Sequence, residues 1–148
     1  VLSGPGLHDV YRFLREEERM AEEPGVAAEV AGREPQRAIV RHGLGGGPGA
    51  CAETLRIFCS LYGAEAGNLV LQYLATGGVY LGGGIAPAIL PALRWGEFLS
   101  AFLDKGRMRN LLSRVPVMVI LDPAAPLLGA ASFAAADGVL ARPPGSRS

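Results

Sequence analysis

The feature that most constrains the fold is an apolar repeat over residues 50–76. Its apolar side chains recur at the i, i+3, i+4 and i+7 spacing of a helix with one buried face: Leu55, Phe58, Cys59, Tyr62, Ala66, Leu69, Val70 and Tyr73. Gly63 and Gly67 lie one turn apart on this predicted helix. Because glycine lowers helix propensity, we expect another backbone to approach closely at these two positions. Gly77 is expected to end the helix as a C-cap.

The sequence after this helix predicts strands separated by helices. Residues 79–81 are expected to form a short strand, residues 82–84 a turn, and residues 85–93 a helix with Pro87 in its first turn. Two short amphipathic helices are predicted at residues 97–103 and 107–112. Residues 116–121 form a continuous apolar run, typical of a strand that a parallel sheet buries on both faces. An alanine-rich helix is predicted at residues 126–136, so the pattern favours a helix-rich α/β chain with a few strands.

The region before residue 50 is less regular. Val1-Leu2 is interpreted as the end of a strand, and the chain is therefore expected to be a carboxyl-terminal piece of a longer protein. Ser3-Gly4-Pro5-Gly6 predicts a turn, followed by a helix over residues 7–20 with Val10, Phe13 and Leu14 on one face. Residues 21–49 are predicted to be an exposed, mobile connection with short helices near 26–31 and 36–42. We expect one domain over residues 1–140 and a disordered tail at residues 141–148.

Composition excludes several classes of protein. The 148 residues carry 14 basic and 14 acidic side chains, so no excess positive charge indicates binding to nucleic acid or to an anionic membrane. Residues 66–93 are uncharged, but glycines and prolines interrupt them too often for a membrane-spanning helix. Cys51 and Cys59 would lie about 12 Å apart on one helix, too far for a disulfide. They are expected to be reduced core thiols of a cytoplasmic protein.

The main candidate site is the glycine run after the predicted strand. Gly82, Gly83 and Gly84 would place bare backbone between the end of a strand and the start of a helix, where free N–H groups suit an anion or the polar edge of a nucleotide. A tight turn without a ligand explains the same residues, and this pattern leaves both interpretations open. It is not a Walker loop, because no lysine and hydroxyl follow the glycines.

The usual catalytic side chains are scarce. His8 and His42 are far apart in the sequence and are expected to line the surface rather than to bind a metal. Asp122 follows the second predicted strand, but its neighbour Pro123 favours turn initiation as its role.

A series of motifs spans almost the whole chain: Ser3-Gly4-Pro5-Gly6-Leu7, Ala66-Gly67-Asn68-Leu69, Gly77-Gly78-Val79-Tyr80-Leu81-Gly82-Gly83-Gly84-Ile85-Ala86-Pro87, Phe102-Leu103-Asp104-Lys105-Gly106-Arg107-Met108, Pro116-Val117 and Leu127-Leu128-Gly129-Ala130-Ala131. In this order the series resembles the carboxyl-terminal part of bacterial glucokinases. The glycine turn followed by the 102–108 motif is its most specific part.

The resemblance implies an actin-like, ribonuclease-H-like ATPase fold with two domains around a cleft. This chain would supply the carboxyl-terminal part of the large domain, a connecting helix at the hinge, and a final helix from about residue 126 that packs on the small domain. The implied reaction transfers the γ-phosphoryl group of ATP to the 6-hydroxyl of glucose, with Mg²⁺ at the phosphates. Gly82, Gly83, Gly84 and Ile85 correspond to the adenosine-side motif. The implied partners are glucose, the remainder of the glucokinase chain and a second subunit of a homodimer.

The family's phosphate loops, catalytic aspartate and sugar contacts all precede the position equivalent to Val1. No catalytic residue and no metal ligand is therefore assigned, Mg²⁺ is expected to be held mainly by parts outside this chain, and the chain alone is predicted to be inactive. Two alternatives stay open: a non-catalytic sugar- or nucleotide-binding regulator of the same superfamily, and the product of a split gene.

Overall fold

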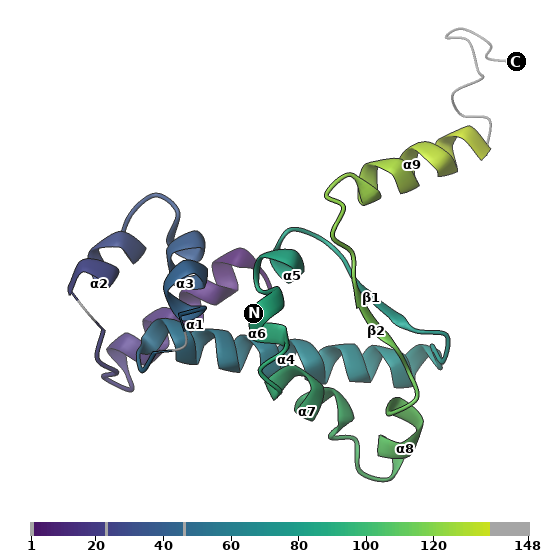
Figure 1. The fold of residues 1–148 in the computed structure, drawn as a ribbon, viewed down its shortest axis with the longest axis horizontal. Helices are drawn as coiled ribbons and strands as arrows, with labels where there is room; N and C mark the ends of the chain where they lie inside the picture. Colours follow the sequence, from purple (N-terminus) through teal and green to yellow (C-terminus); the bar gives the residue numbers. More distant parts are fainter. Residues whose placement is uncertain (1, 23, 46, 137–148) are drawn as a thin grey trace, which may run out of the picture.

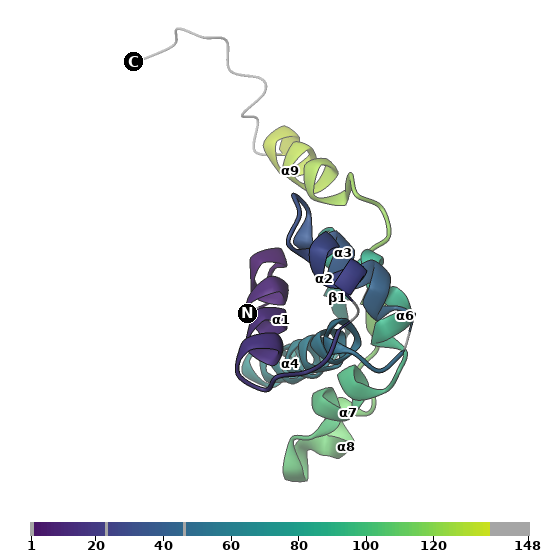
Figure 2. The same ribbon diagram turned by 90° about the vertical axis from the view of Figure 1, so that its left-hand side faces the viewer.

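The computed structural model describes residues 2–22, 24–45 and 47–136, and its central element is a long helix, α4. Helices α1 and α3 pack on its amino-terminal half and α7 packs on its carboxyl-terminal half (Figures 1 and 2). The bounds are α1 (Gly4–Glu16), α2 (Pro24–Val30), α3 (Pro35–Gly43), α4 (Ala50–Tyr73), β1 (Val79–Leu81), α5 (Ile85–Ala88), α6 (Leu90–Leu93), α7 (Glu97–Leu103), η1 (Gly106–Met108), α8 (Arg109–Leu112), β2 (Val117–Val119) and α9 (Ala125–Ala136).

Helix α1 begins earlier than the sequence pattern predicts. Ser3 is its N-cap, and its Oγ accepts a hydrogen bond from the Gly6 N–H at 3.1 Å. The expected turn is therefore the first turn of the helix. The prediction that Phe13 lies on the buried face is wrong, since this side chain is 53% exposed. The buried face starts one turn earlier and consists of Leu7, Tyr11 and Leu14.

Residues 21–49 contribute to the core, in contrast to the expected exposed connection. The two short helices expected there are α2 and α3, and α3 packs on α1 and α4 with Ala38 and Ile39 buried. Glu22 also reaches α4, where its Oε2 accepts a hydrogen bond from the Cys51 N–H at 3.0 Å. This contact satisfies one of the free N–H groups at the start of α4. The mobility of the segment stays a prediction.

The two helical glycines of α4 permit the close approach that the sequence predicts. A Cβ on Gly63 would overlap the carbonyl oxygen of Phe98 in α7, and a Cβ on Gly67 would lie 2.7 Å from the carbonyl oxygen of Phe102. Both phenylalanine side chains are buried, and their rings stack with centroids 6.2 Å apart. The contact between α4 and α7 therefore depends on the absence of side chains at these positions.

The end of α4 differs from the prediction. Leu74, with φ of 50°, takes the left-handed C-cap conformation expected at Gly77, and its N–H donates to the Val70 carbonyl. Leu69 and Tyr73, both placed on the buried face by the repeat, are 43% and 71% exposed. The apolar repeat thus overestimates the length of the buried helix by about one turn.

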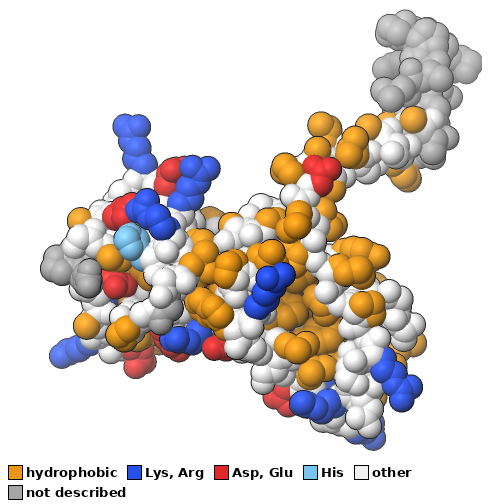
Figure 3. All heavy atoms as spheres, in the orientation of Figure 1, with side chains coloured by type: hydrophobic (Ala, Val, Ile, Leu, Met, Phe, Trp, Pro, Cys, Tyr) orange, Lys and Arg blue, Asp and Glu red, His pale blue; other side chains and the backbone are white. Residues whose placement is uncertain are grey.

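Strands β1 and β2 form a parallel pair within the described residues, with Val79 opposite Val117 and Leu81 opposite Val119. β2 was expected to be buried on both faces, but its residues are only half-buried. One face of the strand pair borders a groove of about 520 Å³. Its lining residues are Leu81, Val117, Val119 and Leu121 from the strands and their ends, and Leu90, Leu93, Arg94, Gly96, Phe98 and Leu99 from α6, α7 and the turn between them. Figure 3 shows hydrophobic side chains gathered between α6 and the strands on this face.

The helix predicted over residues 85–93 is divided in two. Ile89 separates α5 from α6, with a backbone conformation outside the helical region. Pro91 is the physical cause, because it has no N–H to bond to the carbonyl four residues earlier. Helix α5 therefore has four residues, which limits what its amino terminus can bind.

Helix α9 projects away from the rest of the chain (Figures 1 and 2). Its large apolar side chains are exposed, with Leu127 at 73% and Phe133 at 69%. Its packing on a second domain stays a prediction. Val1 and the tail at 141–148 lie outside the described residues. Across the described ranges, no helix combines the length and the apolar character needed to span a membrane.

Candidate functional site

The glycine turn that follows β1 presents bare backbone, as its sequence predicts. Gly83 has φ of +90°, a conformation that favours glycine. A Cβ added to Gly83 or Gly84 would find nothing within 4 Å, whereas one on Gly82 would contact the Ile120 side chain at 3.5 Å. Gly82 therefore packs against the end of β2, and Gly83 and Gly84 leave open space above the backbone.

Two pockets flank this turn, and Gly84 lines both of them. The first, which we call the strand-end pocket, has a volume of about 600 Å³. It lies between the glycine turn and the segment after β2, and its lining includes Gly83, Pro87, Ile120 and Asp122. Segments from both strand ends thus meet at one cavity, which is the usual place for a ligand in parallel α/β sheets.

The second, which we call the α3 pocket, has a volume of about 290 Å³ and lies among α1, α3 and α5. Its apolar lining residues are Leu7, Val40, Ile85 and Ala88, and its polar side chains are Gln36, Arg37 and Arg41. The α3 residues were not predicted as site residues. Their only sequence signal is the four-residue spacing of Arg37 and Arg41, which places both on one face of α3.

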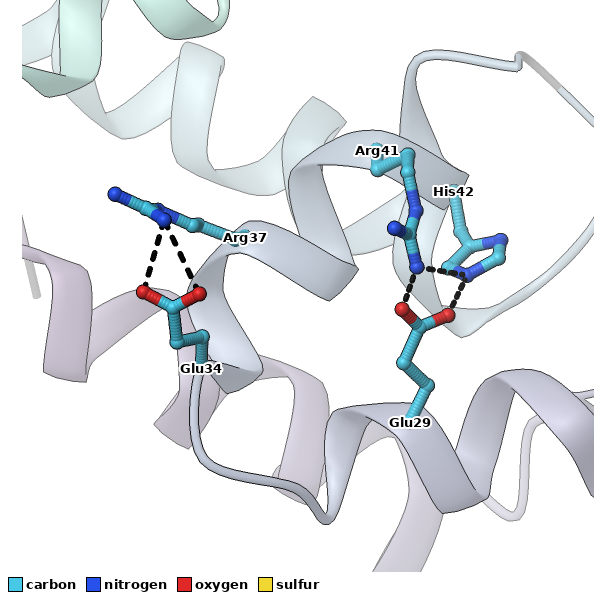
Figure 4. A network of polar contacts seen from close by, with 5 residues as sticks. All are labelled: Glu29, Glu34, Arg37, Arg41 and His42. Atoms are coloured by element: carbon cyan, nitrogen blue, oxygen red, sulfur yellow. Dashed lines mark hydrogen bonds and ion pairs between the residues drawn. The ribbon is translucent and has the colours of Figure 1, made fainter.

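The two α3 arginines are held by glutamates (Figure 4). Arg37 Nη1 lies 2.9 Å from Glu34 Oε1, and Arg41 pairs with Glu29 of α2. His42 Nε2 lies 2.6 Å from the other oxygen of Glu29. His42 therefore belongs to a surface network that links α2 to α3. Over the described residues, no three His, Cys, Asp or Glu side chains gather as metal ligands would.

The electrostatics of the turn do not favour binding of a bare anion. A four-residue helix such as α5 carries only a small part of the dipole that attracts anions to longer helices. Asp122, which borders the strand-end pocket, accepts a hydrogen bond from the Ala124 N–H at 2.8 Å. This contact confirms the turn-forming role expected for Asp122.

Both cysteines are free and buried, as predicted. Burial raises the pKa of Cys51 to about 12, with the Glu22 carboxylate adding to the rise. Burial also raises the pKa of Cys59 to about 12. Because the thiolate is the reactive form of cysteine, neither side chain is suited to act as a nucleophile.

The parallel strand pair, the bare glycine turn and its two pockets define a helix-rich α/β domain with a candidate ligand site at its strand ends. A family profile described as glucokinase matches residues 1–137, and the chain belongs to this family. It is 42% identical over 146 residues to a glucokinase of Trichormus variabilis, a match that covers 91% of this chain and 43% of the relative.

Other curated relatives agree with this assignment. The chain is 44% identical to a glucokinase of Nostoc punctiforme, over 91% of this chain and 43% of the relative. It is 36% identical to a glucokinase of Xanthomonas campestris pv. campestris strain B100, over 90% of this chain and 37% of the relative. The expected relationship is confirmed, and the chain spans about two-fifths of the length of these relatives.

Proposed function

We propose that the polypeptide that carries this chain is an ATP-dependent glucokinase, and that this chain forms the adenosine side of its ATP site. The proposal includes the actin-like fold and the phosphorylation of glucose at its 6-hydroxyl. The observation that carries it is the position of Gly84, which lines two pockets at the end of a parallel strand. Membership of the glucokinase family supports the choice of reaction.

The residues present fit an adenosine group. Gly83 and Gly84 leave space that any side chain would fill. Gly84 lines both the largely apolar α3 pocket and the larger strand-end pocket, and Gly83 lines the strand-end pocket. Gly82 keeps the turn against Ile120 at the end of β2. Gly82, Gly83, Gly84 and Ile85 would therefore bind and orient the nucleoside, and the open backbone would let the phosphates extend away from it.

The described residues would bind and orient the nucleotide, and we assign none of them a role in proton transfer. When bound, Mg²⁺ would neutralise phosphate charge, and it would be held mainly by parts of the site outside this chain. We assign no Mg²⁺ ligand in this chain, because Asp122 is the one carboxylate among the described residues that line the strand-end pocket and it serves in the turn with Ala124. We assign no catalytic base in this chain either, so phosphoryl transfer would need groups from the rest of the polypeptide.

Glucose, the rest of the kinase chain and a second subunit of a homodimer are the proposed partners, and the cytoplasm is the proposed location. A regulator that binds sugar or nucleotide without catalysis is the alternative. The kinase predicts glucose-dependent turnover of ATP, and the regulator predicts binding of sugar or nucleotide without turnover.

A coupled assay of the polypeptide that carries this chain tests the proposal. Glucose 6-phosphate should accumulate with Mg-ATP and glucose together, and not when either is left out. Mg-ATP binding without glucose-dependent turnover would favour the regulator. If neither binding nor turnover is measured, the proposed function is wrong.

A further inference from the structure

Three arginines line a pocket between α2 and α3, which we call the arginine pocket. Its volume of about 500 Å³ is large enough for a small molecule. The charged residues of its lining are Arg33, Arg37, Arg41, Glu29 and Glu34. Among the described residues that line it, Ala38 has the only apolar side chain. Because burying apolar surface would gain little here, the lining suits a charged ligand that is rich in hydroxyl groups.

Arg33 and Arg37 can bind an anion. Arg33 precedes α3 in the chain and is exposed, and it has no ion-pair partner among the described residues. Arg37 is 81% exposed and pairs with Glu34, which is 61% exposed. Exposed ion pairs are weak, so an anion with more charge than a carboxylate can replace Glu34 at Arg37 at little cost.

The third arginine is held in place by a contact between the two helices (Figure 4). Glu29 of α2 pairs with Arg41, and its other oxygen lies 2.6 Å from His42 Nε2. Glu29 thereby ties one wall of the arginine pocket to the other. If Glu34 turns to solvent, three arginines face one glutamate, an excess of about two positive charges. This excess matches the charge of a phosphomonoester at pH 7.

We propose that the arginine pocket binds a sugar phosphate, with the phosphate group between Arg33 and Arg37 and the hydroxyl groups directed to Glu29. Guanidinium groups bind phosphate oxygens through paired N–H donors. A carboxylate has about four acceptor sites, so Glu29 can accept from hydroxyl groups while it contacts Arg41 and His42. The inference goes beyond the proposed function, because the pocket contains no residue of the glycine turn and needs no kinase activity to hold a ligand.

Calorimetric titration with glucose 6-phosphate, on the polypeptide that carries this chain, tests the inference. Saturating Mg-ADP and glucose are added first, so that the site at the glycine turn is already occupied. Arg33→Ala should weaken the binding of glucose 6-phosphate about tenfold, because the phosphate loses a charge-assisted hydrogen bond. Arg109→Ala in α8 is the matched control, since Arg109 is also exposed and has no ion pair in the part of the chain that the structure describes. It should leave the affinity unchanged.

Glu34→Gln should change the affinity in the opposite direction. The variant keeps the size of the side chain and removes the carboxylate that competes with phosphate for Arg37. Glucose 6-phosphate should therefore bind roughly two- to fivefold more tightly than to wild type. A misfolded variant could not produce such a gain. Because Arg33 and Glu34 are both exposed, circular dichroism should show the wild-type thermal midpoint for both variants.

Inorganic phosphate, titrated in the same way, shows whether the sugar is recognised. It should bind about tenfold more weakly than glucose 6-phosphate, because it cannot reach Glu29 while it contacts Arg33 and Arg37. Equal affinities for the two ligands would overturn the assignment to a sugar phosphate. The inference is also wrong if wild type does not bind glucose 6-phosphate, or if Arg33→Ala and Glu34→Gln both bind it as wild type does. None of these results decides the proposed function, which the coupled assay tests separately.

Discussion

The close contact between α4 and α7 makes Gly63→Ala the most informative stability variant. The new Cβ would lie 2.8 Å from the Phe98 carbonyl carbon and overlap its oxygen. To reach ordinary contact at 3.4 Å, this carbon must move by roughly 0.6 Å, the closer oxygen must move further, and the backbone of α7 must move with them. Overpacking of this kind costs about 3 kcal/mol, and alanine recovers about 1 kcal/mol of helix propensity. We expect a net loss of about 2 kcal/mol in the free energy of unfolding.

Urea unfolding of the polypeptide that carries this chain, followed by circular dichroism, measures this loss. Gly25→Ala in α2 is the matched control, because a Cβ there would find nothing within 4 Å. It should leave the protein as stable as wild type or stabilise it by up to about 1 kcal/mol. If Gly63→Ala is as stable as Gly25→Ala, α4 and α7 do not approach each other as described.

Three further predictions concern other parts of the chain. Glu22→Ala should lower the free energy of unfolding by about 1 kcal/mol in the same urea assay, because the Cys51 N–H at the start of α4 loses its acceptor; unchanged stability would contradict this capping role. Stability should fall as pH rises from 9 toward 12, because unfolded thiols ionise near 9.0 while burial keeps Cys51 and Cys59 protonated up to about 12. A Cys51→Ala/Cys59→Ala variant should lose less stability over this interval, and an equal fall in both proteins would refute the linkage. The isolated chain should show no glucose-dependent ATP turnover in a coupled assay, and measurable turnover would place a catalytic base within it.

The close contact between α4 and another backbone could be predicted from the sequence, because glycine lowers helix propensity and is usually kept in an amphipathic helix where another backbone approaches. Gly63 and Gly67 predicted a close backbone neighbour, and α7 occupies that place. Helix ends were less predictable. Leu74 takes the left-handed conformation expected at Gly77, although a leucine carries no local signal for it.

The candidate site was predictable only in part. The glycine turn could be found because bare backbone after a strand is visible in the sequence, and residues 82–85 lie where expected. The α3 pocket could not be found in this way, because it combines residues from α1, α3 and α5 that are distant in the chain. The glycine- and proline-rich composition of residues 21–49 favoured an exposed loop. The burial of Ile39 against other helices outweighs this local tendency.

The most direct test of the account compares two glycine variants in titration calorimetry with Mg-ATP. Gly84 and Gly77 both lie in open space with ordinary backbone angles, but only Gly84 lines the two pockets. Gly84→Val should lower the affinity for Mg-ATP at least tenfold, because its side chain fills the space assigned to the nucleoside. Gly77→Val should bind as wild type does. Equal affinities in Gly84→Val and Gly77→Val would contradict the assignment of the glycine turn to the nucleotide site.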